Sequence, residues 1–394
     1  MTRVFLDARS ITAEPAGVAR YAQSLVARLI ALRPQWDWVI LRHASNREPL
    51  VAHDVAETYS DIPIDSMANH LFGAQAVRAA IRRHGAPDVY HSLFQVVPRG
   101  LPRALRVVVT AHDFIDMDHP GAVRSNRAGA ARLGAYANVA FPHAMRRADR
   151  VIAISEHTAA RARQLTDPGK IVVIGHGVEP RFFEQPPETG PIVRFLVADG
   201  WRNIVAIGND KPYKNLASLI RAFAHADLPT TRLVLVGRCD GLRPLSDALG
   251  LGDRTAFLGF LGDEDLRRVL GHADLFVFPS TLEGFGMPPL EAMAMGVPTA
   301  VSDLEPMRTV AGDAAMRFAP YDVYALAEIL RRVLGDSALH ASLSRAGRAW
   351  AARWSWDAAA QASYECCENW EPISRTRPPR GARRSRRSAS LTPP

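Results

Sequence analysis

Short apolar segments alternate with longer segments of helical periodicity along almost the whole chain. This alternation is typical of an α/β fold, in which parallel strands lie side by side and helices cover both faces of the sheet. In Val18–Leu32, for example, apolar residues recur at the spacing of a helix. The expected strands are, in chain order, Arg3–Ala8, Trp36–Arg42, Asp88–His91, Arg106–Thr110, Arg150–Ile154, Ile171–Ile174, Ile204–Ile207, Arg232–Val236, Thr255–Phe257, Leu275–Phe278, Thr299–Ser302 and Ala315–Phe318.

A break in the alternation divides the chain into two parts. The segment Gln185–Gly190 (QPPETG) contains proline and glycine and has no hydrophobic period, which is typical of a linker. At 394 residues the chain is long enough for two ordinary domains. We therefore expect two Rossmann-like domains whose parallel sheets face a central cleft, with ligands bound at the carboxyl ends of the strands.

The composition is that of a soluble globular protein, with 47% hydrophobic residues and a mean hydropathy of −0.07. No apolar run is long enough for a transmembrane helix, which needs about 20 residues, and the beginning of the chain, MTRVFLDARS, lacks the apolar region of a signal peptide. The three cysteines, Cys239, Cys366 and Cys367, fit neither a disulfide framework nor a zinc site. These features lead us to expect a cytoplasmic protein.

Most of the formal net charge of +8 comes from the end of the chain. After Glu371 there is no acidic residue, and there are seven arginines: Arg375, Arg377, Arg380, Arg383, Arg384, Arg386 and Arg387. A segment rich in proline, serine and arginine cannot build a core, so we expect a disordered basic tail. It could bind anionic lipid headgroups at the inner face of the membrane, or have no function. Because it has no aromatic residues, a specific nucleic-acid site is not expected.

The segment Phe278–Asp303 (FPSTLEGFGMPPLEAMAMGVPTAVSD) has the features of a strand, a loop and a helix that together bind a phosphate. The loop Leu282–Met287 contains two glycines, and two prolines then open a helix at roughly Pro289–Met295, where a missing N–H has no cost. Free backbone N–H groups and the positive end of a helix would point above the sheet. Glu283 and Glu291 flank this position and are expected to point into the same crevice. The alternative is a helix start that carries acidic residues only because of the helix dipole.

The sequence from Glu283 to Glu291, EGFGMPPLE, followed by AMAMGVP, resembles the signature of the family-four retaining glycosyltransferases of GT-B fold. The resemblance implies that Glu283 contacts hydroxyls of the donor sugar and that Glu291 holds the ribose of a nucleoside-diphosphate sugar. It also implies that the backbone amides of Phe285, Gly286 and Met287 bind the diphosphate.

The resemblance covers roughly residues 3–370 and refines the expected domain organisation. It implies an acceptor-side domain over residues 1–185 and a nucleotide-sugar-binding domain over residues 186–355. A C-terminal helix over residues 356–372 is expected to cross back to the first domain, and residues 373–394 form the basic tail.

The loop Ala206–Asn215 (AIGNDKPYKN) places Lys211 and Lys214 directly before a helix. A lysine at this end of a helix is electrostatically unfavourable, so an anionic partner is expected. In the resembling family Lys214 matches the lysine that binds the diphosphate, whereas Tyr213 stands where an arginine is common, so that Lys211 can supply the second charge. Asn209 of the same loop is included in the predicted donor site. Two solvated lysines are the alternative.

Three further residues complete the predicted site. Gly17, in EPAGVARY, opens the first long helix, so its backbone is expected to face the donor phosphate; a helix start without a ligand is the alternative. His112 follows an expected strand and, with Asp113, matches an H-D pattern of the resembling family that implies contact with the transferred sugar. Leu261, in LGFLGDEDL, is expected near the nucleotide base.

Two further motifs bear on whether a metal or a dinucleotide is bound. Asp116-Met117-Asp118 has the D-x-D pattern of metal-dependent glycosyltransferases, but we interpret it as a chance match in an expected loop, and no metal is predicted. A G-x-G-x-x-G sequence does not occur, which argues against a dinucleotide oxidoreductase. No cofactor is expected beyond the nucleotide-sugar, which is a co-substrate.

The sequence therefore predicts a metal-independent retaining hexosyltransferase with Glu283, His112 and Lys214 as its catalytic residues. Because GFGMPPLEAM and KPYKNL look most like bacterial mannosyltransferases, GDP-mannose is the expected donor and a saccharide or lipid-linked saccharide of surface-polysaccharide (lipopolysaccharide) synthesis the expected acceptor. The loops expected at Ser45–Met67 and Asp116–Asn138 would select the acceptor. A UDP-glucose or other UDP-sugar transferase, a nucleotide-sugar epimerase and a non-catalytic sugar-nucleotide-binding subunit remain alternatives.

Overall fold

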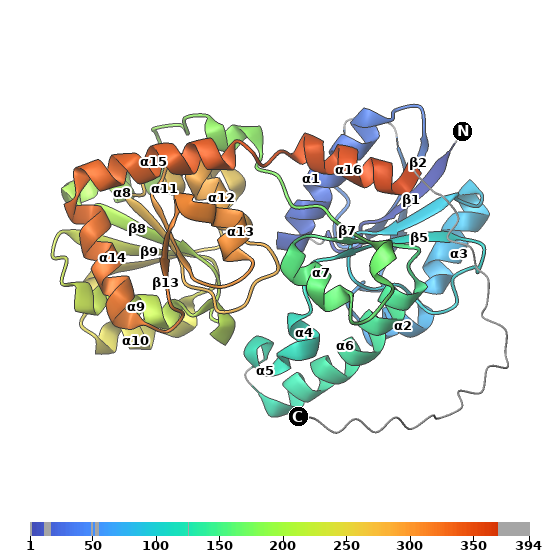
Figure 1. The fold of residues 1–394 in the computed structure, drawn as a ribbon, viewed down its shortest axis with the longest axis horizontal. Coiled ribbons are helices and arrows are strands. Elements are labelled where there is room, and N and C mark those ends of the chain that lie inside the picture. The colour runs from blue at the N-terminus through green and yellow to red at the C-terminus, as the bar shows by residue number, and fades with distance from the viewer. Residues whose placement is uncertain (1, 12–16, 49, 52–54, 125, 369–394) are drawn as a thin grey trace, which may run out of the picture.

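The computed structural model describes residues 2–11, 17–48, 50–51, 55–124 and 126–368. They form two separate parallel sheets, one in each lobe of Figure 1. The seven-stranded sheet has the order β3-β2-β1-β4-β5-β6-β7 and the six-stranded sheet the order β10-β9-β8-β11-β12-β13. The strands are β1 (Arg3–Asp7), β2 (Asp37–His43), β3 (Ala56–Ser60), β4 (Val89–Ser92), β5 (Arg106–Ala111), β6 (Arg150–Ala153), β7 (Ile171–Val173), β8 (Arg202–Ile207), β9 (Thr231–Val236), β10 (Thr255–Gly259), β11 (Leu275–Phe278), β12 (Thr299–Ser302) and β13 (Met316–Phe318).

Helices cover both faces of the first sheet, as its nearly continuous apolar strands require. Successive residues of β1 illustrate this, since Phe5 joins the core beneath α3 and α6, whereas Val4 and Leu6 join the core beneath α1. The helices of this domain are α1 (Gly17–Leu32), α2 (Met67–Phe72), α3 (Ala74–His84), α4 (Ile115–Asp118), α5 (Pro120–Val123), α6 (Arg127–Arg147) and α7 (Glu156–Ala162).

The second sheet is covered in the same way. Val205 packs on the side of α11 and α12, and its neighbours Ile204 and Ala206 pack on the side of α9 and α14. The helices of this domain are α8 (Pro191–Val197), α9 (Leu216–Ala226), α10 (Arg243–Ala248), α11 (Asp263–Gly271), α12 (Met287–Ala294), α13 (Met307–Ala311), α14 (Val323–Gly335) and α15 (Ser337–Ala351).

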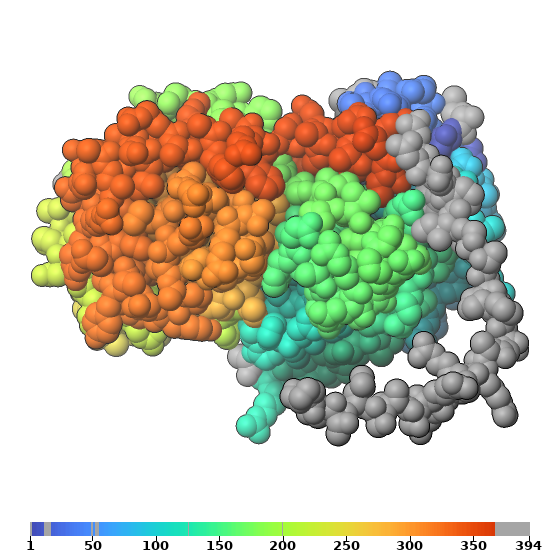
Figure 2. All heavy atoms as spheres, in the orientation of Figure 1, coloured from blue at the N-terminus to red at the C-terminus, as the bar shows by residue number. Residues whose placement is uncertain are grey.

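The last helix, α16 (Trp356–Glu368), lies on the first domain beside α1, after α15 has run along the second domain (Figure 1). In the space-filling view this red C-terminal part of the chain extends over both lobes (Figure 2). Trp356 and Tyr364 are buried in the core shared with α1. The guanidinium of Arg33 lies 3.8 Å from the centre of the Tyr364 ring, so an aromatic and a cationic contact fix this helix.

The structure corrects the interpretation of two segments as loops. Residues 45–67 contain the strand β3, and residues 116–138 contain most of α4, all of α5 and the first half of α6. β3 escaped prediction because it is a half-buried edge strand of mixed polarity, AETYS, in which Glu57 pairs with the buried Arg42 of β2. The helices α4 and α5 have four residues each, too few to give a hydrophobic period.

Within the described residues no helix is long and apolar enough to span a membrane. The predicted basic tail, residues 373–394, lies outside them.

Candidate functional site

The carboxyl ends of the two sheets meet at the loops that follow β5 and β11. A Cβ atom added to Gly284, after β11, would overlap the carbonyl oxygen of His112 and lie 3.1 Å from Cβ of Asp113, after β5. The Ser155 hydroxyl donates a hydrogen bond of 2.7 Å to the Gly284 carbonyl, and the Thr158 hydroxyl donates one of 3.0 Å to the His112 carbonyl. The two domains are therefore in direct backbone contact beside the predicted site, and only glycine fits at position 284.

Lys214 and Glu283 form an ion pair within the second domain. The Lys214 Nζ atom lies 2.6 Å from Glu283 Oε1, and the side chains are only 16% and 12% exposed. The Nζ atom also lies 5.1 Å from the centre of the Tyr213 ring and 5.4 Å from that of Phe278. The N–H of Thr281 donates a hydrogen bond of 2.7 Å to the Tyr213 carbonyl, which holds the loops after β8 and β11 together. Lys214 is thus positioned by two aromatic rings and by the carboxylate of Glu283.

The amino end of α12 presents unpaired amides. Gly286 has a φ of 101°, and a Cβ atom there would overlap Cε of Met307, so glycine is required for this turn. Among the described residues, the backbone N–H groups of Phe285, Gly286 and Met287 find no hydrogen-bond acceptor. Pro288 and Pro289 occupy the next two positions and have no N–H to satisfy. Free amides and the positive end of the helix dipole are the elements of an anion site.

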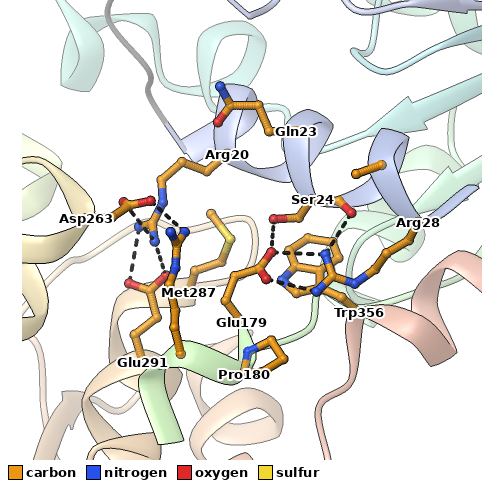
Figure 3. A pocket seen from close by; sticks show the side chains of 12 residues that line it. Arg20, Gln23, Ser24, Arg28, Glu179, Pro180, Asp263, Met287, Glu291 and Trp356 are labelled. Carbon is orange, nitrogen blue, oxygen red and sulfur yellow. Dashed lines mark hydrogen bonds and ion pairs between the residues drawn. The ribbon is translucent and has the colours of Figure 1, made fainter. Parts of the chain in front are cut away.

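Glu291 is paired across the domain interface with Arg20 of α1 (Figure 3). The Arg20 Nη2 atom lies 2.7 Å from Glu291 Oε1, and Nη1 lies 3.2 Å from Oε2. Nη2 also lies 3.8 Å from a carboxylate oxygen of Asp263, at the start of α11. Burial acts to lower the pKa of Arg20, but the Glu291 and Asp263 carboxylates outweigh it and raise that pKa above its ordinary value. Arg20 was not predicted, because it stands 271 residues from Glu291 in the chain.

Glu283 and Glu291 therefore flank the α12 loop with different partners. Glu283 contacts a lysine of its own domain, and Glu291 contacts an arginine of the other domain. Arg20, Glu291 and Met287 line a pocket of about 490 Å³ between α1, α11 and α12, together with Gln23, Ser24, Ala27, Arg28, Glu179, Pro180, Arg181, Asp263 and Trp356 (Figure 3).

His112 is buried and neutral. Its Nε2 atom lies 2.9 Å from the carbonyl oxygen of Leu93, which can only accept, so Nε2 carries the proton and Nδ1 is an acceptor. Burial lowers the pKa of His112 to about 4, despite the opposing effect of the Leu93 carbonyl. The Tyr21 ring meets the imidazole edge-on at 4.7 Å between centres. At neutral pH the imidazole thus offers an acceptor rather than a positive charge.

Burial shifts the pKa values of Asp113 and Lys211, and nearby charges oppose each shift. Burial raises the pKa of Asp113 to about 6, while the hydrogen bond of 2.9 Å from the Ile115 N–H and the charge of Lys214 act in the other direction. Burial lowers the pKa of Lys211, and the carboxylate of Asp116 opposes this.

The D-x-D motif is divided between two environments. Asp116 interacts electrostatically with Lys211, whereas Asp118 forms an ion pair of 2.7 Å with Arg161. In the part of the chain that the structure describes, no group of three or more His, Cys, Asp or Glu residues could hold a metal ion.

The other predicted residues take the following positions. A Cβ atom added to Gly17 would lie 3.7 Å from Met287 Cε, so the start of α1 faces the start of α12. The Asn209 side chain accepts a hydrogen bond of 3.1 Å from the Lys211 N–H and so shapes its own loop. Leu261 packs partly buried against the core of the second domain, next to Phe260, which is 63% exposed.

A cluster of aromatic rings that was not predicted from the sequence connects four segments of the chain next to the site. The buried His176 ring lies 4.4 Å from Phe285, 4.8 Å from Tyr21 and 5.5 Å from Trp356, measured between ring centres. Burial lowers the pKa of His176 well below its ordinary value, so the ring stays neutral. It acts as an aromatic filler between α1, α16 and the α12 loop.

Two family models match the chain, one on each domain. The model described as Glycosyltransferase Family 4 matches residues 15–182, and the model described as Glycosyl transferases group 1 matches residues 195–350. The chain belongs to the family-four glycosyltransferases. The resemblance inferred from the α12 motif is thereby confirmed.

Curated relatives of the chain include two proteins of Escherichia coli. The serotype-specific mannosyltransferase WbdA is 29% identical over 232 residues, which are 56% of this chain and 28% of WbdA. The O-antigen chain mannosyltransferase B is 34% identical over 158 residues, which are 38% of this chain and 42% of that protein. The chain thus spans less than half the length of each of these relatives.

Solved structures match the chain over nearly its whole length. Sucrose-phosphate synthase from Thermosynechococcus elongatus has a TM-score of 0.72 at 21% identity and covers 93% of this chain and 98% of its own. Anabaena HepE in complex with UDP and glucose has a TM-score of 0.69 at 20% identity and covers 94% of this chain and 100% of its own. These similarities confirm the predicted GT-B fold.

Proposed function

We propose that this protein is a retaining glycosyltransferase that moves mannose from GDP-mannose to a saccharide or lipid-linked saccharide acceptor. The observation that carries the proposal is the arrangement around the start of α12. Three amides without acceptors lie between two carboxylates, Glu283 and Glu291, and each carboxylate is held by a cation. Such an arrangement suits a ligand with a diphosphate in the middle and hydroxyl groups at both ends.

In the proposed complex the diphosphate of the donor binds the amides of Phe285, Gly286 and Met287 at the positive end of α12. Lys214 lies beside this position and supplies a positive charge, and Lys211 supplies a second one. The Glu291 carboxylate accepts hydrogen bonds from the ribose. The exposed edge near Leu261 is the expected location of the base.

In the proposed reaction the bond between the anomeric carbon and the diphosphate oxygen breaks, and the acceptor oxygen bonds to that carbon on the same face of the sugar. The electron pair of the broken bond stays on the diphosphate, where Lys214 and the α12 amides stabilise it, and a phosphate oxygen takes the proton of the acceptor. Glu283 orients the sugar hydroxyls, and His112 accepts a hydrogen bond from the sugar at Nδ1. The enzyme thus acts by positioning and by electrostatic stabilisation.

GDP-mannose is the first candidate donor because two curated relatives carry mannosyltransferase names. A UDP-sugar is the second, because HepE, which shares the fold, was solved with UDP and glucose. Calorimetric titration with GDP, UDP and ADP, beside the Glu291→Ala variant, separates them. Heat of binding for GDP alone that the variant loses supports a GDP-sugar, and a preference for UDP rejects the mannosyl assignment.

The two alternatives outside transfer chemistry are tested by product analysis. Incubation with GDP-mannose and a mixture of saccharide acceptors is expected to release GDP and to extend the acceptor with retained anomeric configuration. Free epimerised donor would indicate an epimerase. Donor that binds but is never turned over would indicate a binding subunit.

A lipid-linked acceptor would place the enzyme at the inner face of the cell membrane. In this proposal the basic tail after Pro372 binds anionic lipid headgroups. Deletion of the tail is expected to abolish co-sedimentation with vesicles that contain phosphatidylglycerol. Unchanged partition of the shortened protein would reject the role of the tail.

A further inference from the structure

The guanidinium of Arg20 contacts both carboxylate oxygens of Glu291, as Figure 3 shows. One nitrogen lies 2.7 Å from Oε1 and the other 3.2 Å from Oε2, so both carboxylate oxygens are engaged. The Glu291 side chain is only 7% exposed and that of Arg20 22% exposed. This is the geometry of a bidentate pair, which is stronger and more directional than a single contact.

The same two oxygens are the ones that the proposed function assigns to the ribose. A 2′,3′-diol presents two neighbouring O–H donors, much as a guanidinium presents two parallel N–H donors. Arg20 engages both carboxylate oxygens of Glu291, so a ribose diol that pairs with the same two oxygens must take its place. Arg20 and a ribose therefore compete for one position.

We propose that Arg20 is a residue of the donor site contributed by the first domain, which occupies the ribose position on Glu291 until the ribose hydroxyls of the donor displace it. This inference rests on the proposed function. In this role Arg20 provides the counter-charge that the buried Glu291 carboxylate needs.

The structure also provides a place for the displaced guanidinium. Asp263 lies 3.8 Å from Nη2 of Arg20, so a small rotation moves the guanidinium from one carboxylate to the other. Asp263 belongs to the second domain and forms an ion pair of 2.5 Å with Arg181. Arg20 keeps an acidic partner after the exchange, so donor binding does not leave a buried positive charge unpaired.

The exchange has a measurable consequence for affinity. When only a fraction of the molecules has Glu291 free, the apparent dissociation constant equals the intrinsic constant divided by that fraction. Removal of Arg20 should therefore strengthen the binding of ribonucleotides. Nucleotides without the two ribose hydroxyls do not need Glu291 and should be unaffected.

The test compares the full-length wild-type protein with Arg20→Ala and Arg20→Gln by isothermal titration with GDP, UDP and their 2′,3′-dideoxy analogues. Each Arg20 variant is expected to lower the dissociation constant of the preferred ribonucleotide by about tenfold and to leave that of its dideoxy analogue within about twofold. The matched control is Arg161→Ala. Arg161, in α7 of the same domain, is about as exposed as Arg20 and forms an ion pair of 2.7 Å with Asp118, but it does not line this pocket and should not alter nucleotide affinity.

The outcomes separate this inference from the function on which it rests. A wild-type protein that binds none of the nucleotides overturns both. Nucleotide binding that is unchanged or weakened in the Arg20 variants, or strengthened equally for ribose and dideoxyribose forms, overturns the exchange alone. Arg20→Gln keeps a polar, uncharged side chain, so it decides the question if Arg20→Ala does not fold.

Discussion

Lys214 and Glu283 follow different strands, β8 and β11, yet their charged atoms lie 2.6 Å apart at the carboxyl edge of the second sheet. Each side chain is largely withdrawn from water, so each is the neutralising partner of the other. The removal of one leaves a nearly buried charge unpaired, which costs more than the pair itself contributes. The effects of single substitutions here therefore contain both a catalytic and a structural part.

Lys214→Ala is expected to lower kcat by about 10²–10³-fold, because it removes a positive charge from the position where negative charge develops on the leaving diphosphate. Steady-state kinetics with the donor identified by titration measure this. Lys170→Ala is the control, because Lys170 precedes β7 at the amino end of that strand and its Nζ atom donates to the Ala148 carbonyl. An unchanged kcat in Lys214→Ala would remove this lysine from the mechanism.

The structural part can be separated in a double-mutant cycle. If Lys214 and Glu283 act as one unit, the variant with both replaced by alanine should lose less thermal stability than the sum of the two single losses. Additive losses would mean that the ion pair has no net effect on folding.

His112→Ala is expected to lower kcat/KM by about 10- to 100-fold, the effect of removing one buried hydrogen-bond partner. Since burial lowers the pKa of His112 to about 4, the ring is neutral between about pH 6 and 8. The ratio of wild-type to variant activity should accordingly stay constant over this range. A ratio that falls as the pH rises through this range would show that a charged imidazole takes part, contrary to the structure.

Gly284→Ala tests the contact between the domains. The new methyl group would collide with the His112 carbonyl and press on Asp113, so the two loops must separate. We expect a loss of about 1–3 kcal/mol in unfolding free energy, as is usual for overpacking, together with a fall in activity. Gly335→Ala is the matched control, because a Cβ atom there meets nothing within 4 Å. Equal melting temperatures for the two variants would mean that the contact is absent in solution.

The sequence predicted those parts of the site that depend on local pattern. The strand, glycine loop and proline-led helix around Glu283 are contiguous, and Lys214 stands directly before a helix, so each could be identified from its neighbours. Arg20 could not, because its role depends on how α1 of one domain meets α12 of the other. The bond from Ser155 to the Gly284 carbonyl escaped prediction for the same reason, because it joins the two domains.

A similar distinction applies to the fold. The central strands are mostly apolar, and the sequence predicts them within one or two residues, whereas β3 was missed because its residues are only partly buried and mixed in polarity. What makes β3 a strand is its partner β2, whose buried Arg42 needs the carboxylate of Glu57. That requirement lies in the neighbouring strand and not in the sequence AETYS itself.

Asp113→Asn is expected to stabilise the protein at alkaline pH. Burial raises the pKa of Asp113 from 3.8 to about 6, so the folded state binds this proton more tightly than the unfolded state. The stabilisation from this proton is fully present below the ordinary pKa and is lost as the pH rises through about 6, where the half-buried carboxylate becomes charged. Asparagine cannot ionise, so the variant should melt a few degrees higher than wild type at about pH 8 and by a smaller margin at about pH 5.

Melting temperatures at these two pH values give the comparison directly, with Asp61→Asn as the control at an exposed aspartate. The control matters because other acids titrate in the same range and shift both proteins alike, so that only the difference between variant and wild type reports on Asp113. A difference in melting temperature that is the same at both pH values would mean that Asp113 ionises as it does in water. The contact between the His112 and Gly284 loops would then be open enough for water to reach this carboxylate. A difference that grows with pH, together with reduced transfer activity, would mean that the charge of this carboxylate beside Lys214 serves the reaction at the expense of stability.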